Sequence, residues 1–196
     1  MLRITAGRYR GHRLQAPAGR WLRPTGDRIK QSIYNVLQDL IPGARVLDLC
    51  AGTGNLGLEA WSRGAAEVVL VERSRQALVV LESNWRRLGG SPQVRVVQDD
   101  AVHALRTFPA SSFDVVLADP PYDAGLEEPL LQALEQARPG WFVLQHGRVW
   151  RLTHLPAGYR LFRSRRFGDT VVDFLVREEA ADGGAQTQGG AVPGDV

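Results

Sequence analysis

Apolar runs of strand length recur through the middle of the chain and alternate with stretches of helical spacing from residue 44 to about residue 146. The runs are Val46–Cys50, Val68–Val71, Val94–Gln98, Phe113–Ala118 and Trp141–Gln145. This alternation predicts an α/β fold with a doubly wound parallel sheet. Two later runs, Gly158–Phe162 and Thr170–Arg177, are joined by a tight basic turn and predict a terminal antiparallel hairpin. Seven mostly parallel strands are therefore expected.

The two ends of the chain differ from this middle part. Residues 1–25 are expected to form a basic amino-terminal arm or small β-hairpin. A helix is expected from about Asp27 to Leu40, with Thr25 or Asp27 as its cap. Residues 26–177 then form one domain, and residues 178–196 lack periodicity and predict a disordered tail.

No apolar run approaches membrane-spanning length, and the amino terminus lacks the apolar region of a signal peptide. The single cysteine excludes an internal disulfide framework and a multi-cysteine zinc cluster. The four histidines are scattered without the spacing of metal ligands. We therefore expect a cytoplasmic protein that uses no metal.

The stretch Asp119-Pro120-Pro121-Tyr122 directly follows the fourth apolar run. Two prolines cannot continue a central strand, so the backbone leaves the sheet in a stiff turn. The Asp119 carboxylate and the Pro120 carbonyl would each accept a hydrogen bond from the exocyclic amine of a nucleobase. The stiff turn would hold these two acceptors in place before the base binds. Tyr122 would stack on the base. A buried turn that happens to contain an acid explains the four residues about equally well.

A glycine-rich loop follows the first apolar run. Gly52, Gly54 and Gly57 satisfy the dinucleotide fingerprint G-x-G-x-x-G, and Glu72 stands twenty residues after Gly52, as in nicotinamide dehydrogenases. Asp48 argues against that class, because its carboxylate would repel a pyrophosphate at the helix N-terminus. S-adenosylmethionine has no phosphate and carries an ammonium and a sulfonium, which a nearby anion favours. Asp48 therefore favours S-adenosylmethionine as the cofactor.

The remaining cofactor contacts follow from strand order. Glu72 would accept hydrogen bonds from the ribose hydroxyls. Asp100 would bind the adenine amine, with the Ala101 amide facing a ring nitrogen. Helix capping before Ala101–Arg106 explains Asp99 and Asp100 nearly as well, and one of the pair can cap while the other binds. The expected cofactor residues are Thr25, Asp48, Ala51, Gly52, Gly54, Glu72, Asp100, Ala101 and Asp119.

Positive charge is concentrated at the amino terminus. Residues 1–30 hold eight Lys and Arg against one acid, a balance of +7, whereas residues 31–196 hold sixteen against twenty, a balance of −4. Tyr9, His12 and Trp21 are interleaved with these cations. This pattern is typical of a nucleic-acid binder, and a solvated basic hairpin is the plainer alternative. The candidate RNA contacts are Arg3, Arg8, Arg10, Arg13, Arg23, Arg28 and Tyr122.

Two further basic segments have open roles. Thr25 would lie over the methionine end of the cofactor. Arg28 and Asn35 would either face the site or decorate a helix surface. A cluster of four arginines either extends the RNA-binding track or forms a solvated hairpin turn: Arg160, Arg163, Arg165 and Arg166.

Several motifs occur together along the chain: Arg3-Ile4-x-x-Gly7, Arg23-Pro24-Thr25-x-Asp27-Arg28, Asp48-x-x-Ala51-Gly52-Thr53-Gly54, Asp119–Tyr122 and Phe167-Gly168-Asp169-Thr170. Through them the sequence resembles the small-subunit ribosomal RNA guanine-N2 methyltransferases, the RsmD family, over residues 1 to about 177. The resemblance implies a Rossmann-like class I fold, S-adenosylmethionine as cofactor and methylation of one guanine in 16S rRNA. We expect a monomer, and the sequence leaves open whether free rRNA or an assembled small subunit is the substrate. Cys50 departs from the general methyltransferase pattern, because many such loops have a glycine there.

The residues alone imply only methyl transfer to an exocyclic amine, in which Asp119, Pro120 and Tyr122 would be catalytic. A DNA amine methyltransferase shares this chemistry, but the chain has no spare length for a target-recognition domain. A protein glutamine methyltransferase gives no reason for the basic arm. A non-catalytic RNA-binding module would keep the arm without needing the cofactor loop.

Overall fold

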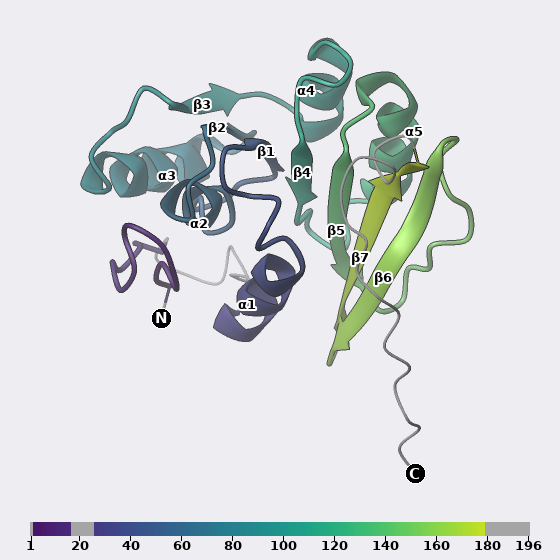
Figure 1. Cartoon of the computed structure of the whole chain (residues 1–196), viewed down its shortest axis with the longest axis horizontal. Coiled ribbons are helices and arrows are strands. Elements are labelled where there is room, and N and C mark those ends of the chain that lie inside the picture. Colours follow the sequence, from purple (N-terminus) through teal and green to yellow (C-terminus); the bar gives the residue numbers. More distant parts are fainter. Residues whose placement is uncertain (1, 17–25, 179–196) are drawn as a thin grey trace.

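The computed structural model describes residues 2–16 and 26–178, which form a sheet covered by helices on both faces (Figure 1). The strands are β1 Arg45–Leu49, β2 Glu67–Glu72, β3 Val94–Gln98, β4 Val115–Ala118, β5 Trp141–Gly147, β6 Tyr159–Phe167 and β7 Thr170–Arg177. Their order is β3-β2-β1-β4-β5-β7-β6. Strands β1 to β5 are parallel, and β7 is antiparallel to both of its neighbours. The expected seven-stranded α/β sheet with an antiparallel terminal hairpin is confirmed.

The helices are α1 Asp27–Val36, α2 Gly57–Ser62, α3 Arg75–Arg87, α4 Ala101–Thr107 and α5 Glu127–Ala137. Successive strand residues point to opposite faces of the sheet, so each strand contributes to two cores. Val46 of β1 belongs to the core under α1, α2 and α3, and Leu47 belongs to the core under α4 and α5. The strand order reverses between β1 and β4, and ligands bind at such a switch point in α/β sheets.

The amino-terminal arm packs onto the first of these cores. Leu2, Ile4 and Leu14 are buried in it, and an antiparallel bridge joins Arg3 to Arg13. Residues 2–14 therefore double back as a small hairpin, as expected. The division of the chain into arm, domain and tail stays a prediction, and residues 17–25 and 179–196 lie outside the described residues. Within the described ranges, no helix combines the length and the apolarity needed to cross a membrane.

Two expected boundaries were wrong. Helix α1 ends at Val36 rather than Leu40, because the chain tightens into a turn in which the Leu40 amide donates to the Leu37 carbonyl. This turn lets both Leu37 and Ile41 reach the core. The residue that caps α1 is Gly26, without a side-chain bond, and Asp27 is the first helical residue, with its carboxylate 3.1 Å from Arg3 Nε.

The basic cluster was also misplaced. Arg160 lies in the run that was expected to be a strand, but Arg163, Arg165 and Arg166 also lie on β6, which continues to Phe167, and not in the turn. The length of β6 was underestimated because it is an edge strand. Its residues 160–166 are all exposed, so no alternation of apolar and polar residues marks the strand. Its pairing with β7, whose residues are mostly buried, extends it.

Candidate active site

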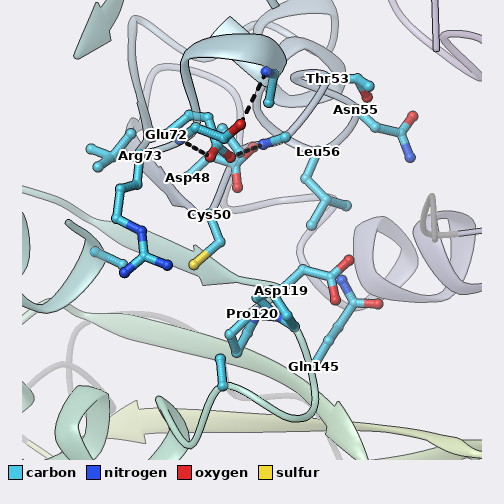
Figure 2. Close-up of a pocket in the computed structure, with 18 of the residues that line it drawn as sticks. Asp48, Cys50, Thr53, Asn55, Leu56, Glu72, Arg73, Asp119, Pro120 and Gln145 are labelled. Atoms are coloured by element: carbon cyan, nitrogen blue, oxygen red, sulfur yellow. Dashed lines mark hydrogen bonds between the residues drawn. The ribbon is translucent and has the colours of Figure 1, made fainter. Parts of the chain in front are cut away.

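The carboxyl ends of β1, β2 and β4 open onto a cleft of about 1090 Å³. It brings together most of the residues expected at the cofactor and catalytic sites: Asp48, Ala51, Gly52, Glu72, Asp100, Ala101, Asp119, Pro120 and Tyr122. Figure 2 shows Asp48 and Glu72 on one side of Cys50, with Asp119 and Pro120 on the other. Gly54 does not line the cleft, and Thr25 lies outside the described residues.

The glycine loop between β1 and α2 depends on backbone conformations that side chains disfavour. Gly54 has φ +81°, and a Cβ added there would lie 2.5 Å from Leu81 Cδ1. A Cβ at Gly57 would lie 2.1 Å from Leu70 Cδ2, so glycine allows α2 to approach the sheet. Cys50 has φ +60°, the left-handed region that glycine prefers, which agrees with its unusual place in the pattern. These residues shape the cleft through the backbone.

Asp48 is buried at the bottom of the cleft with 1% exposure, and its Oδ2 accepts a 2.7 Å hydrogen bond from the Gly57 amide. Loss of water, together with the charges of Asp119 and Glu72, raises the pKa of Asp48 to about 8 against the opposing effect of the Gly57 bond. Three carboxyl groups therefore converge on one cavity. A cation bound among them would relieve their mutual repulsion.

Glu72 bridges the loop that follows β1 and the loop that follows its own strand. Its Oε2 accepts from the Gly52 amide at 2.8 Å and its Oε1 accepts from the Ser74 amide at 2.7 Å. Both oxygens have a second lone pair, so these bonds orient the carboxylate and leave it able to accept from a diol. Its predicted role at the ribose stays a prediction.

Asp100 caps α4, as one of the two alternatives proposed. Its Oδ1 accepts from the amides of Val102 and His103 at 3.0 and 3.2 Å, while Asp99 bonds to the His103 ring. Asp100 Oδ2 lies 3.8 Å from an Arg73 guanidinium nitrogen at the cleft. Asp100 therefore caps the helix with Oδ1, while Oδ2 faces Arg73 at the cleft. Binding of the adenine amine by Asp100 stays a prediction.

The diproline turn places Asp119 and Pro120 directly after β4, with Pro120 buried and Asp119 half-buried. The Tyr122 hydroxyl lies 2.8 Å from Thr170 Oγ1. The Tyr122 ring lies against Gly147, where an added Cβ would be 3.1 Å from Cδ2. Because Tyr122 is held at both its ring and its hydroxyl, it is a fixed surface of the cleft with 36% exposure.

Sequence reasoning missed Gln145, Asn55 and Phe167 as residues that line the cleft. Gln145 is 1% exposed and lies beside Asp119 in Figure 2. Its signal was available, because it is a polar residue at the end of an apolar strand next to the strand of the diproline turn. Asn55 accepts a hydrogen bond from Lys30 Nζ at 2.8 Å, a contact between distant residues that no local pattern indicates.

The four arginines that the structure describes in residues 2–16 lie on the surface outside the cleft. Arg3, Arg8, Arg10 and Arg13 are exposed and none of them lines the cleft. Arg28 and Asn35 are also exposed and do not line it. Arg28 lies with its guanidinium carbon 5.9 Å from the centre of the Phe167 ring. Contact of these arginines with RNA stays a prediction, and Arg23 lies outside the described residues.

Residues 2–176 match the family model described as conserved hypothetical protein 95. The chain is 32% identical over 194 residues to "Ribosomal RNA small subunit methyltransferase D" of Escherichia coli K12, which covers 94% of each chain. It is 37% identical over 136 residues to the protein of that name from Haemophilus influenzae, covering 68% of this chain and 70% of the other. A solved structure, "Putative methyltransferase yhhF from Escherichia coli", superposes with a TM-score of 0.81 at 31% identity over 90% of this chain and 98% of that one.

Proposed function

Because the chain belongs to the conserved hypothetical protein 95 family and is a methyltransferase, we propose that it methylates the N2 amine of a guanine in small-subunit rRNA. The observation that carries the proposal is the position of Asp119 and Pro120 at the cleft that also holds Asp48 and Glu72. Methyl donor and acceptor amine can meet there. The names of the relatives from Escherichia coli and Haemophilus influenzae support rRNA as the substrate.

The proposed cofactor is S-adenosylmethionine, and the chemistry of the cleft fits it. The pKa of Asp48 is raised by lack of water and by the neighbouring carboxylates. A ligand with positive charge would favour the ionised form of Asp48, whereas a pyrophosphate would oppose its ionisation. Glu72 would accept from the ribose hydroxyls, Asp100 from the adenine amine, and the backbone of Ala51 and Gly52 would border the ligand. The cofactor supplies an electrophilic methyl group.

The proposed work of the diproline turn is to position the amine. The N2 amine of guanine is a poor nucleophile, because its lone pair is delocalised into the ring. The Asp119 carboxylate and the Pro120 carbonyl would accept its two hydrogens and aim the lone pair towards the cofactor side of the cleft. Tyr122 would stack on the flipped base with its ring already held against Gly147. The proton released after transfer would pass to Asp119 or to water.

Incubation with labelled S-adenosylmethionine and unmodified 16S rRNA, either free or within small subunits, tests the proposal. Mapping by mass spectrometry should find one N2-methylguanosine, and the comparison of substrates shows whether assembled subunits are needed. Light scattering of the active enzyme should give the mass of a monomer. Absence of label from every RNA, or label confined to DNA or protein, would overturn the proposed function.

A further inference from the structure

Strand β6 is an unusually exposed element that the proposed chemistry does not use. It lies at the edge of the sheet opposite β3 (Figure 1). All residues from 160 to 166 are exposed, and four of these seven are arginines. Between residues 159 and 167 the strand carries no acid. Charged edge strands protect a sheet against aggregation, so charge alone does not indicate a binding surface.

The sides on which the β6 residues point are set by a bulge. Leu161 pairs with Leu175, but the next pair is Arg163 with Phe174, so Phe162 is an extra residue. Leu175 belongs to the core under α4 and α5, whereas Phe174 belongs to the core under α1. Since facing residues in paired strands point to the same side, the bulge turns Arg163 to the α1 side.

Beyond the bulge, every second residue of β6 points to the α1 side. Arg165 pairs with Val172, which belongs to the core under α1, and Phe167 follows on the same side. Without the bulge, Ser164 and Arg166 would occupy the α1 side instead. Before the bulge, Arg160 pairs with Val176. Val176 is next to Leu175 on β7 and points to the opposite side, so Arg160 also lies on the α1 side.

The α1 side of β6 combines free cations with an exposed aromatic ring. Phe162 is 41% exposed, and the guanidinium carbons of Arg160 and Arg163 lie 5.9 and 5.5 Å from its ring centre. Within residues 2–16 and 26–178, neither of these arginines nor Arg165 forms an ion pair. Phe162 packs edge-to-face on Trp141, with ring centroids 5.0 Å apart, and edge protection does not explain why the rest of its ring is exposed between these cations. Planar guanidinium and aromatic groups beside unpaired positive charge suit unstacked bases and their phosphates.

This side of β6 leads to the cleft. Phe167 ends the strand, lines the cleft and has the Arg28 guanidinium over its ring. The distance along β6 from Arg160 to Phe167 is roughly 23 Å at about 3.3 Å per residue. A strand of RNA whose base enters the cleft beside Tyr122 and Phe167 could therefore continue along β6.

We propose that the α1-facing side of β6 binds an unpaired strand of the substrate RNA next to the target guanine. The binding residues are Arg160, Phe162, Arg163 and Arg165, and the inference rests on the proposed function. Arginines contact phosphates and Phe162 stacks on a base. The surface is sequence-tolerant, because every base has an aromatic face, and it orients the strand towards the cleft.

The test compares substitutions on the two sides of the sheet. Arg163→Gln/Arg165→Gln removes two charges from the α1 side, and the control Arg106→Gln/Arg166→Gln removes two from the side of α4, where Arg106 is exposed. Binding of labelled oligouridylate and of transcribed 16S rRNA is measured by fluorescence anisotropy at several salt concentrations. The first variant should bind on the order of tenfold more weakly, with a salt slope smaller by about 1.4, while the control changes less than about twofold.

A second pair tests stacking. Phe162→Ala should weaken binding on the order of tenfold with an unchanged salt slope. Leu161→Ala is the matched control, because Leu161 is also 41% exposed but points to the other side of the sheet. In methylation assays the α1-side variants should raise KM for RNA while kcat and the affinity for S-adenosylmethionine stay unchanged.

Each result decides the matter. An equal loss of RNA affinity in the two arginine double variants would mean that only the net charge of the protein matters, which would overturn the proposal. Aggregation of the α1-side variant with unchanged RNA affinity would assign β6 to edge protection and overturn it as well. If the wild-type enzyme methylates 16S rRNA and every variant behaves as its control does, the surface is wrong and the proposed function stands. If β6 variants lose oligouridylate binding but no RNA is methylated, the proposed function is wrong and the surface stands.

Discussion

Lys30 and Glu59 form an ion pair inside the protein, with Nζ 3.1 Å from Oε2 and both side chains 0% exposed. Lys30 also donates to Asn55 in the glycine loop and to the Arg3 carbonyl. Glu59 accepts from the amides of Thr5 and Ala6. Burial lowers the pKa of Lys30 although Glu59 opposes this, whereas at Glu59 the charge of Lys30 and the hydrogen bonds outweigh burial and lower its pKa. The pair joins the arm, α1 and α2 to the wall of the cleft.

Lys30→Met should destabilise the fold by about 3 kcal/mol, because the Glu59 carboxylate loses its buried cation and keeps the partly exposed Arg63, 2.8 Å from its Oε1. Urea unfolding at neutral pH measures the change. Arg28→Met, two residues away on the exposed side of the same helix, is the control and should change stability by less than about 0.5 kcal/mol. A loss below about 1 kcal/mol for Lys30→Met would show that the pair does not join these elements energetically.

Asp48 should make stability fall as pH rises. Its folded pKa of about 8 lies above the usual value of 3.8, so between these values the folded protein holds a proton that the unfolded chain has released. Stability is therefore full below about pH 4 and declines towards pH 8, by up to about 1.4 kcal/mol per pH unit. Asp48→Asn does not titrate, so its stability relative to the wild type should rise between pH 5 and pH 8.

Urea unfolding of both proteins at pH 5, 6.5 and 8 measures this difference. Asp123→Asn, an exposed carboxylate that does not line the cleft, provides the control. A difference between wild type and Asp48→Asn that stays constant with pH would mean that Asp48 is ionised in the folded protein throughout this range.

Asp119→Ala should abolish turnover and leave affinity for S-adenosylmethionine within about threefold, because the proposed role of Asp119 is to hold the acceptor amine. Calorimetric titration and single-turnover methylation separate the two effects. Asp123→Ala in the same turn should keep both. An equal loss of binding and turnover in Asp119→Ala would move Asp119 from the amine to the cofactor.

The ring of Tyr122 should matter more than its hydroxyl. Tyr122→Ala removes base stacking and should lower kcat/KM by about 5- to 150-fold, corresponding to about 1–3 kcal/mol. Tyr122→Phe and Thr170→Val each remove the 2.8 Å hydrogen bond from one end while keeping the ring, and both should stay within about tenfold of wild type. If Tyr122→Phe were as impaired as Tyr122→Ala, stacking would not be the role of the ring.

The carboxylates of the cleft could be predicted from the sequence, because neighbouring parallel strands end at the same edge of the sheet. Asp48 lies near the carboxyl end of its apolar run, and Glu72 and Asp119 directly follow theirs. Neighbouring parallel strands bring such positions to one edge. Cys50 was singled out by its place in the loop pattern, and its φ of +60° gives the physical reason. Gln145 belonged to the same set and was missed because one polar residue after an apolar run is a weak signal.

The sequence by itself determined the succession of strands and helices along the chain, the glycine loop and the acids at the cleft, since these depend on local periodicity and on backbone conformations that few residues adopt. Only the tertiary structure decided that Lys30 meets Glu59, that Tyr122 rests on Gly147 and that the arginines of β6 divide between two sides of the sheet. The reason is that burial of a charge, close packing against a glycine and the phase of a strand beyond a bulge each depend on a partner distant in the chain.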